Sequence, residues 1–209
     1  MPKKEAPLQQ LSDFLPPGTF SAVSAYLHSY KIHLTIARQR KSILGDYRHQ
    51  TAIKNHRISI NGNLNPFAFL LTLLHEIAHL LAFEQYGGKI ASHGKEWKQV
   101  YSGLLQQFLK EKIFPAEIEF ALIKSLKNPA ASPDGYRDAE DGLIRVLRNF
   151  DKIKNGNKLV EEVPVNALFK LADGRIFKRG EKQRKRYKCL ELSTRKMYLF
   201  SPVYEVELV

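Results

Sequence analysis

Residues 65–88 read NPFAFLLTLLHEIAHLLAFEQYGG, and they carry the strongest helix signal in the chain. The opening pair Asn65-Pro66 is typical of a helix start, because proline at the first helical position lacks an N–H group that would be unpaired there anyway. Apolar side chains cover nearly every face of the turns that follow, which predicts a central, buried helix over 67–86. Gly87-Gly88 is the expected end of that helix.

Two histidines and a glutamate interrupt this apolar run as His75-Glu76-Ile77-Ala78-His79. Residues four apart lie above one another on a helix, so both imidazoles can reach one metal ion at about 2.0–2.1 Å. Glu76 is then placed to address a water on the metal without binding the metal itself, as in zinc peptidases. The alternative is a pair of ordinary core histidines, but such polar groups on a buried apolar helix are costly without a partner.

A catalytic zinc ion needs a third protein ligand and an open fourth position. The downstream candidates are one histidine and four carboxylates: His93, Glu84, Glu96, Glu111 and Glu117. His93 follows the Gly87-Gly88 break, where the chain can reverse and return the next helix toward the metal. The metzincin pattern is excluded, because Ala82 and Gln85 stand where it requires glycine and histidine. A helix-borne glutamate, as in thermolysin-like enzymes, stays open as the third ligand.

The rest of the N-terminal part predicts more helices and a small sheet. The further helices are expected in these places: two short ones within 8–30, and longer ones over 94–109 and 115–126. Strict apolar alternation over 31–37 predicts a strand, and a second short strand is expected at 58–60. Gly45-Asp46 has the composition of a turn. The expected class is α+β, a mainly helical domain with a small antiparallel sheet near its N-terminus.

Beyond residue 127 the composition changes. Residues 128–142 have the composition of a linker, and a short amphipathic helix is expected after them. From Val165 onward the alternation is of strand type, with a hairpin signal at Asp173-Gly174. The chain is therefore expected to have these parts: a domain over 1–127, a linker with a short helix over 128–162, and a basic antiparallel β module over 163–209.

Basic residues exceed acidic ones by 33 to 21, and the net charge of +12 favours binding to a polyanion such as nucleic acid. Eleven basic and three acidic residues lie between Lys170 and Lys196, where Tyr187 and Tyr198 could add base stacking to phosphate contacts. The candidate contact residues are Arg38, Arg40, Lys41, Lys178, Arg179, Lys182, Arg184, Lys185, Arg186 and Lys188. We expect sequence-independent binding to single-stranded DNA, since no groove-reading motif is present. A solvated basic face is the alternative.

The single cysteine, Cys189, excludes an intramolecular disulfide and any four-cysteine zinc site. No run approaches the roughly 18 consecutive apolar residues of a membrane span, and the N-terminus lacks an apolar signal segment. We therefore expect a cytoplasmic protein without a membrane partner, whose charge could bring it to the nucleoid. Trp97 is expected to be a core anchor. Either Tyr86 or Tyr101 is a candidate to polarise a substrate carbonyl. The remaining histidines are expected to be surface or cap residues: His28, His33, His49 and His56.

The segment 73–79, the thirteen-residue gap after it and the box His93-Gly94-Lys95-Glu96-Trp97 resemble the metallopeptidase domain of the SprT family. That family includes Spartan, the eukaryotic protease for DNA–protein crosslinks. The basic segment 38–45 and the helix entry 63–66 are also similar, so that the resemblance covers about residues 20–127. It implies a zincin-like fold, one zinc ion with His75, His79 and His93 as its ligands, and Glu76 as the catalytic base. Many members end in a zinc ribbon with paired cysteines. Because Cys189 stands alone, the β module is expected to resemble a ribbon without its metal, held together by apolar burial.

These observations favour a zinc-dependent endopeptidase that acts on DNA-associated or DNA-crosslinked proteins. The alternative is a nucleic-acid-binding protein whose metal site is structural or vestigial, which would cleave nothing. A peptidase for soluble proteins, with activity independent of DNA, is a third hypothesis. A cleavage assay with and without DNA separates them.

Overall fold

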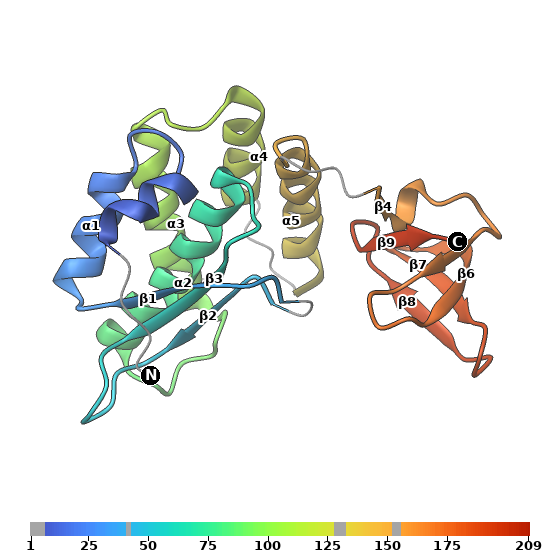
Figure 1. Ribbon diagram of the computed structural model, residues 1–209, viewed down its shortest axis with the longest axis horizontal. Helices are drawn as coiled ribbons and strands as arrows, with labels where there is room; N and C mark the ends of the chain where they lie inside the picture. The colour runs from blue at the N-terminus through green and yellow to red at the C-terminus, as the bar shows by residue number, and fades with distance from the viewer. Residues whose placement is uncertain (1–6, 41–42, 128–132, 152–155) are drawn as a thin grey trace. The chain divides into compact units, whose positions relative to one another are not determined.

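A computed structural model describes residues 7–40, 43–127, 133–151 and 156–209. The chain divides into two compact units, Met1–Ala139 and Glu140–Val209. Figure 1 labels most of the helices and strands of both units. The first unit contains the long apolar helix, and the second contains the strand-rich, basic part of the chain.

The first unit combines helices with a small sheet. Its helical elements are a 3-10 helix, η1 (Leu8–Phe14), and the α-helices α1 (Phe20–Ser29), α2 (Pro66–Tyr86), α3 (Lys95–Lys110) and α4 (Ala116–Lys127). Its strands are β1 (His33–Ala37), β2 (Gly45–Arg48) and β3 (Arg57–Asn61). Helix α5 (Pro133–Arg148) spans the boundary between the units. The α+β class is confirmed, as are the helices expected within 8–30 and over 67–86, 94–109 and 115–126.

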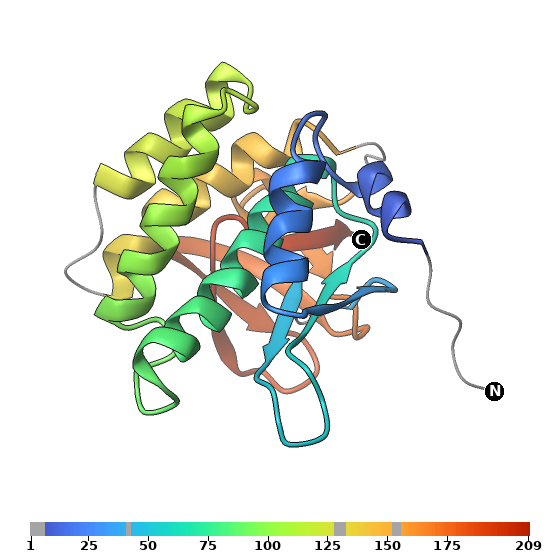
Figure 2. The same ribbon diagram turned by 90° about the vertical axis from the view of Figure 1, so that its left-hand side faces the viewer.

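Helix α2 is central to the first unit, where it contacts β2 and β3 as well as α3 (Figures 1 and 2). The Asn65 side chain caps its first turn, where its Oδ1 accepts a hydrogen bond from the Ala68 N–H at 2.9 Å. The largest of its fully buried side chains are Phe69, Leu70, Leu73, Leu74, Ile77 and Leu80. By length and composition alone α2 could cross a membrane, but 56% of its most apolar window is buried inside the structure. It is therefore the expected core helix.

The small sheet has the strand order β1-β3-β2 and is mixed, so the expectation of an antiparallel sheet is wrong. Strand β1 pairs with β3 in parallel, and only β2 and β3 are antiparallel. The chain crosses from one edge of the sheet to the other before β2 and then returns to the centre through a hairpin, which leaves β1 and β3 pointing the same way. The turn expected at Gly45-Asp46 is also wrong. Both residues pair with β3 in β2, so the ladder overrides the local turn preference.

The second unit is a small antiparallel sheet with the strand order β4-β9-β5-β6-β7-β8. Its elements are β4 (Lys158–Leu159), a 3-10 helix η2 (Val160–Glu162), β5 (Leu168–Lys170), β6 (Ile176–Gln183), β7 (Arg186–Glu191), β8 (Met197–Phe200) and β9 (Glu205–Leu208). Its core includes Phe169, Phe177, Tyr187, Cys189, Phe200 and Val206. The expected antiparallel module, with apolar burial and a buried thiol, is confirmed.

The last turns of α5 belong to this second unit. Arg145 donates two hydrogen bonds to the carboxylate of Glu161, at 2.6 and 2.9 Å, and Arg148 donates one to Glu162 at 2.9 Å. The helix begins at Pro133, within the stretch expected to be a linker, and is longer than the short helix expected there. Residues 128–132 of that stretch lie outside the described residues.

Candidate metal centre

Three histidines meet where α2 faces the segment before α3. His75 and His79 lie one turn apart on α2, which ends at Gly87 with φ at 75°, a conformation that glycine adopts without strain. A turn closed by the bond from the Gly94 N–H to the Ala91 carbonyl, at 2.9 Å, then carries His93 up to α3. The three Nε2 atoms are mutual neighbours: His75 and His79 are 3.3 Å apart, and His93 is 3.1 Å from each.

These distances fit a tetrahedral zinc ion. With Zn–N bonds of about 2.0–2.1 Å, two ligand nitrogens at a tetrahedral ion lie about 3.3–3.4 Å apart. The observed separations of 3.1–3.3 Å are close to this value, and three ligands leave one position for a water or a substrate. Among the described residues, these three histidines are the group of metal-binding side chains whose ligand atoms converge.

The protonation state of the three rings also suits a metal ion. Burial, helped by the neighbouring imidazoles, lowers the pKa of His75 to about 3 and that of His79 to about 4. Burial and the charge of Lys98 lower the pKa of His93 as well. All three rings are therefore neutral at pH 7, which is the form in which imidazole binds a metal.

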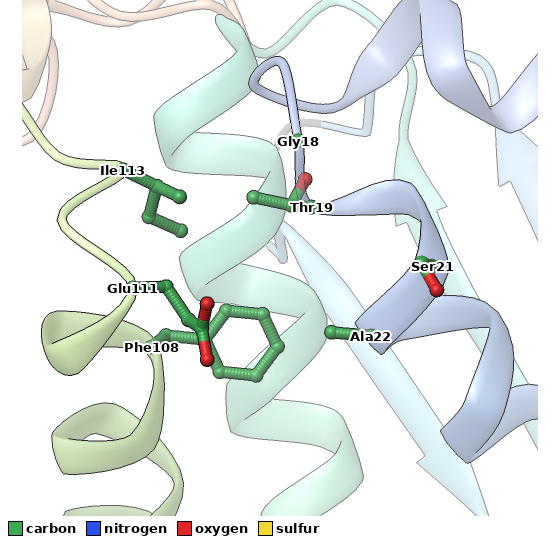
Figure 3. Close-up of a pocket in the computed structure, with 7 residues that line it drawn as sticks. All are labelled: Gly18, Thr19, Ser21, Ala22, Phe108, Glu111 and Ile113. Atoms are coloured by element: carbon green, nitrogen blue, oxygen red, sulfur yellow. The ribbon is translucent and has the colours of Figure 1, made fainter.

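His93, and none of the four carboxylates considered from the sequence, completes this group. Glu84 instead lies 3.3 Å from Nε2 of the buried His56. Glu111 lines a separate pocket between α1 and the end of α3, together with Thr19 and Phe108 (Figure 3). Of the candidates for a third ligand, His93 is therefore the one that the chain reversal after α2 brings to the other two histidines.

Aromatic rings pack against the three histidines. Trp97 on α3 is buried, and its ring centre lies 4.6 Å from those of His75 and His93 and 5.2 Å from that of His79. Tyr101, one turn further, stacks on Trp97 and lies 5.6 Å from His75. The expected core role of Trp97 is confirmed. Of the two tyrosines considered for a substrate carbonyl, Tyr101 is at the centre, whereas the other lies at the exposed end of α2.

Glu76 is buried between α2 and the first residue of β2. Its side chain is only 7% exposed, and its Oε1 occupies the space that a side chain at Gly45 would need. Burial raises the pKa of Glu76 to about 7, with a further rise from Asp46 and an opposing effect of Arg40. A carboxyl group with a pKa near neutrality can both accept and return a proton at pH 7, which is what general acid–base chemistry requires.

Three further polar side chains, whose contacts the sequence did not indicate, lie near His79: Tyr47, His56 and Glu84. The Tyr47 hydroxyl is 3.0 Å from Nδ1 of His56, whose Nε2 is 3.3 Å from Oε1 of Glu84. Since Nε2 faces a carboxylate, we assign its proton there, so Nδ1 accepts from the Tyr47 hydroxyl. Burial raises the pKa of Tyr47 and keeps this hydroxyl protonated. The Tyr47 ring lies parallel to the His79 ring, with 6.5 Å between ring centres.

The expectation that His56 is a surface or cap residue is wrong, since it is only 3% exposed. Its partners come from β2 and α2, and sequence spacing carries no signal for such a contact. The other three expected surface histidines are exposed: His28, His33 and His49.

The upstream residues proposed for nucleic acid differ in their surroundings. Arg38 is exposed, and Lys41 lies outside the described residues. The guanidinium of Arg40 is bound within the fold: it donates to Oδ1 of Asn61 at 2.8 Å, to Oγ of Ser59 at 2.9 Å and to the carbonyl oxygens of Ser59 and Leu44. Arg40 therefore joins Leu44, the residue before β2, to β3.

Several of the basic candidates lie on β6, on β7 and at the turn between these strands. Arg179 and Tyr187 are each only 8% exposed, with the Arg179 guanidinium carbon 4.2 Å from the centre of the Tyr187 ring. Tyr187 is thus a core residue and not an exposed surface for base stacking. The exposed candidates are Lys178, Lys182, Arg184 and Lys185, and Arg186 and Lys188 are partly exposed. Lys182, Arg184 and Lys185 are thus the exposed candidates at the hairpin turn, whereas Lys178 lies further along β6, opposite Leu190.

A helix that carries two histidines and a glutamate, completed by a third histidine from the next segment, defines a candidate three-histidine metal centre of the kind found in metal-dependent hydrolases. The sequence model of the SprT-like family matches residues 9–118, which is more than half of the chain and includes the whole centre. The protein belongs to the SprT-like family, as the sequence resemblance indicated.

A search of characterised proteins gives a short local similarity. The chain is 43% identical over 35 residues to Protein SprT of Pseudomonas entomophila (strain L48). This match covers 17% of the chain and 21% of the relative, so it spans about a fifth of the relative's length. No solved structure matches the chain.

Proposed function

We propose that this protein is a zinc-dependent endopeptidase with a zincin-like centre, and that it cleaves proteins held on or crosslinked to DNA. The observation that carries the proposal is the convergence of three neutral imidazoles within 3.1–3.3 Å of one another, beside a buried carboxylate on the same helix. Membership of the SprT-like family supports it.

His75, His79 and His93 would hold the zinc ion. A zinc ion at such a site polarises the scissile carbonyl group and lowers the pKa of a water molecule to about 7. The chain itself contributes the proton transfers: Glu76 accepts a proton from the attacking water and later returns it to the leaving amine. Trp97 and Tyr101 pack against the ring of His75, and these contacts would help to keep this ligand in its orientation.

Single-stranded DNA is the proposed partner, bound without sequence preference. The support is the net charge of +12 and the group of exposed cations at the β6–β7 turn, which suits contacts to phosphates. Such binding would bring proteins that are already on DNA to the same molecule as the metal centre. Its affinity is expected to fall steeply with salt concentration.

The test is a cleavage assay with the zinc-loaded full chain, with and without single-stranded DNA, comparing wild type with Glu76→Gln. We expect DNA-stimulated cleavage by the wild type and a loss of about 10²–10⁴-fold in kcat for Glu76→Gln, because a general acid–base group contributes that much. Glu117→Gln, which removes the same charge from an exposed position on α4, is the matched control and is expected to retain activity.

Each alternative gives a different result in this assay. Tight, salt-sensitive DNA binding and bound zinc without cleavage of any protein would favour a nucleic-acid-binding protein with a structural metal site. Equal cleavage with and without DNA would favour a peptidase for soluble proteins. Full activity of Glu76→Gln would contradict the proposed role of Glu76.

A further inference from the structure

We infer that Gly45 is a positioning residue for Glu76: the missing side chain at position 45 leaves the space in which the Glu76 carboxylate lies. The inference rests on the proposed function, in which Glu76 transfers the protons. Gly45 would not touch the substrate, and its effect would act through the glutamate alone.

The steric evidence concerns a Cβ atom placed at position 45. Such an atom would lie 2.6 Å from Oε1 of Glu76 and 2.9 Å from its Cγ. It would also lie 2.8 Å from Cγ2 of Thr72, which is one turn earlier on α2. Atoms in a close-packed interior do not approach so closely, so any larger residue must displace a neighbour. Gly45 is not among the glycines with positive φ, so the requirement is for space and not for an unusual backbone conformation.

The backbone on both sides of this contact is held in place. The Leu44 carbonyl accepts hydrogen bonds from the backbone N–H of Asn61 at 2.9 Å and from the Arg40 guanidinium at 3.3 Å. Gly45 itself continues the ladder to β3, and α2 on the other side is the buried core helix. The side chains of Glu76 and Thr72 therefore have to give way when a methyl group is added, and that of Glu76 is the longer and more flexible of the two.

A methyl group at this position is expected to move the carboxylate and leave the metal ligands unchanged. The three nearest atoms to the added Cβ belong to Glu76 and Thr72, and none belongs to a histidine. Misplacing a catalytic group by about 1 Å can cost about 10²-fold in rate. Gly45→Ala should therefore bind zinc normally and lose activity.

The first experiment measures the contact without using activity. It is a double-mutant cycle on the denaturation midpoint of the full chain, with wild type, Gly45→Ala, Glu76→Ala and the double variant. Gly45→Ala is expected to lower the midpoint in the wild-type background, and in the Glu76→Ala background to lower it by less than half as much, because two of the three close contacts are gone. An equal loss in both backgrounds, or failure of Gly45→Ala to fold in both, would overturn the inference.

The second experiment compares Gly45→Ala with Gly62→Ala. A Cβ at Gly62 would lie 2.7 Å from Cγ2 of Ile36, so this control introduces a similar clash beside the same sheet without touching Glu76. We expect Gly62→Ala to keep the wild-type kcat, and Gly45→Ala to lose about 10–10²-fold in kcat with KM and zinc content unchanged. Equal kcat values for Gly45→Ala and wild type would overturn the inference.

The two experiments separate this inference from the proposed function. If the wild type cleaves no protein, the proposed function fails, while the double-mutant cycle still reports whether Gly45 and Glu76 share the space. If the wild type is active and the cycle shows no coupling, the inference fails and the proposed function stands.

Discussion

Removal of the metal is expected to destabilise the first unit and leave the second unchanged, and the chain carries one natural probe in each. Its single tryptophan, Trp97, lies in the first unit against the three histidines. Its single cysteine, Cys189, is buried in the core of the second unit. Tryptophan fluorescence therefore follows the unfolding of one unit, and reaction of the thiol with a disulfide reagent follows the other.

The expected size of the effect follows from mass action. At a free zinc concentration 1,000 times its dissociation constant, an ion that binds only the folded state adds about 4.1 kcal/mol to the free energy of unfolding. An unfolding entropy of about 2.1 cal/mol/K per residue, applied to Met1–Ala139, gives about 0.3 kcal/mol/K. The melting temperature of the first unit should therefore rise by about 14 °C, or about 5 °C for each tenfold increase in free zinc.

The assay is thermal unfolding of the full chain in buffered free zinc and in a chelator, read by both probes. We expect the fluorescence transition to shift with zinc and the labelling of the thiol to show no dependence on it. The second unit contributes no histidine to the converging group, so it has no reason to respond. A fluorescence midpoint that does not move with zinc would refute the metal centre. An equal shift of both probes would refute its confinement to the first unit.

Three further changes test other parts of the structure. His93→Ala removes one of the three converging nitrogens, and zinc affinity measured with a competing chelator should fall by more than the roughly 10–100-fold that outer-shell changes cost. Tyr47→Phe leaves Nδ1 of the buried His56 without its donor, and the free energy of unfolding in urea, read by tryptophan fluorescence, should fall by about 1–3 kcal/mol. The hydrogen bonds between Arg145 and Glu161 hold the pKa of Glu161 below its usual value. This pair should therefore stabilise the second unit above about pH 4.5, and the stabilisation should be lost as the pH falls through the lowered pKa of Glu161. Urea unfolding followed by far-UV circular dichroism between pH 7 and 3 checks this, and Arg145→Gln should show a weaker dependence on acid.

The features predicted correctly are those that local sequence determines. The apolar periodicity of α2 and its start at Asn65-Pro66 depend on neighbouring residues only, and the helix begins at Pro66 as expected. His75 and His79 need nothing more than the helical repeat to share a face. His93 could be included as a candidate because the glycines after α2 allow a reversal, but its place in the site depended on a turn of the chain that only the structure shows.

The errors concern contacts between segments far apart in the sequence. Gly45-Asp46 looks like a turn by composition, and the pairing with β3 that makes it a strand comes from residues about fifteen positions later. His56 is buried because Tyr47 and Glu84 surround it from two other elements. The parallel pairing of β1 and β3 likewise depends on the path between them, and each strand alone would fit either direction.

Charge counts gave the location of the basic cluster but not the surroundings of its members. Arg179 and Tyr187 belong to the same basic stretch as exposed residues, but their positions on β6 and β7 place both side chains on the buried face. Arg40 belongs to a basic run, and its bonds to the Leu44 carbonyl and to β3 give it a structural role. An excess of cations therefore predicts the sign of the partner's charge, and burial decides which cations can meet it.

Helix α2 carries polar side chains that are unfavourable for the stability of the core but suited to metal binding and proton transfer. Burying a polar group without a hydrogen-bonding partner costs about 1–3 kcal/mol by mutational data, and α2 buries Glu76 and partly buries His75 in the same turn. A leucine at either position would suit the core better, so the polar pair is difficult to explain by folding alone. One cation would change this balance, because it would engage the lone pairs of all three imidazoles at once and crosslink α2 to the segment before α3. A bound ion would therefore allow this strongly apolar core helix to carry a cluster of polar side chains.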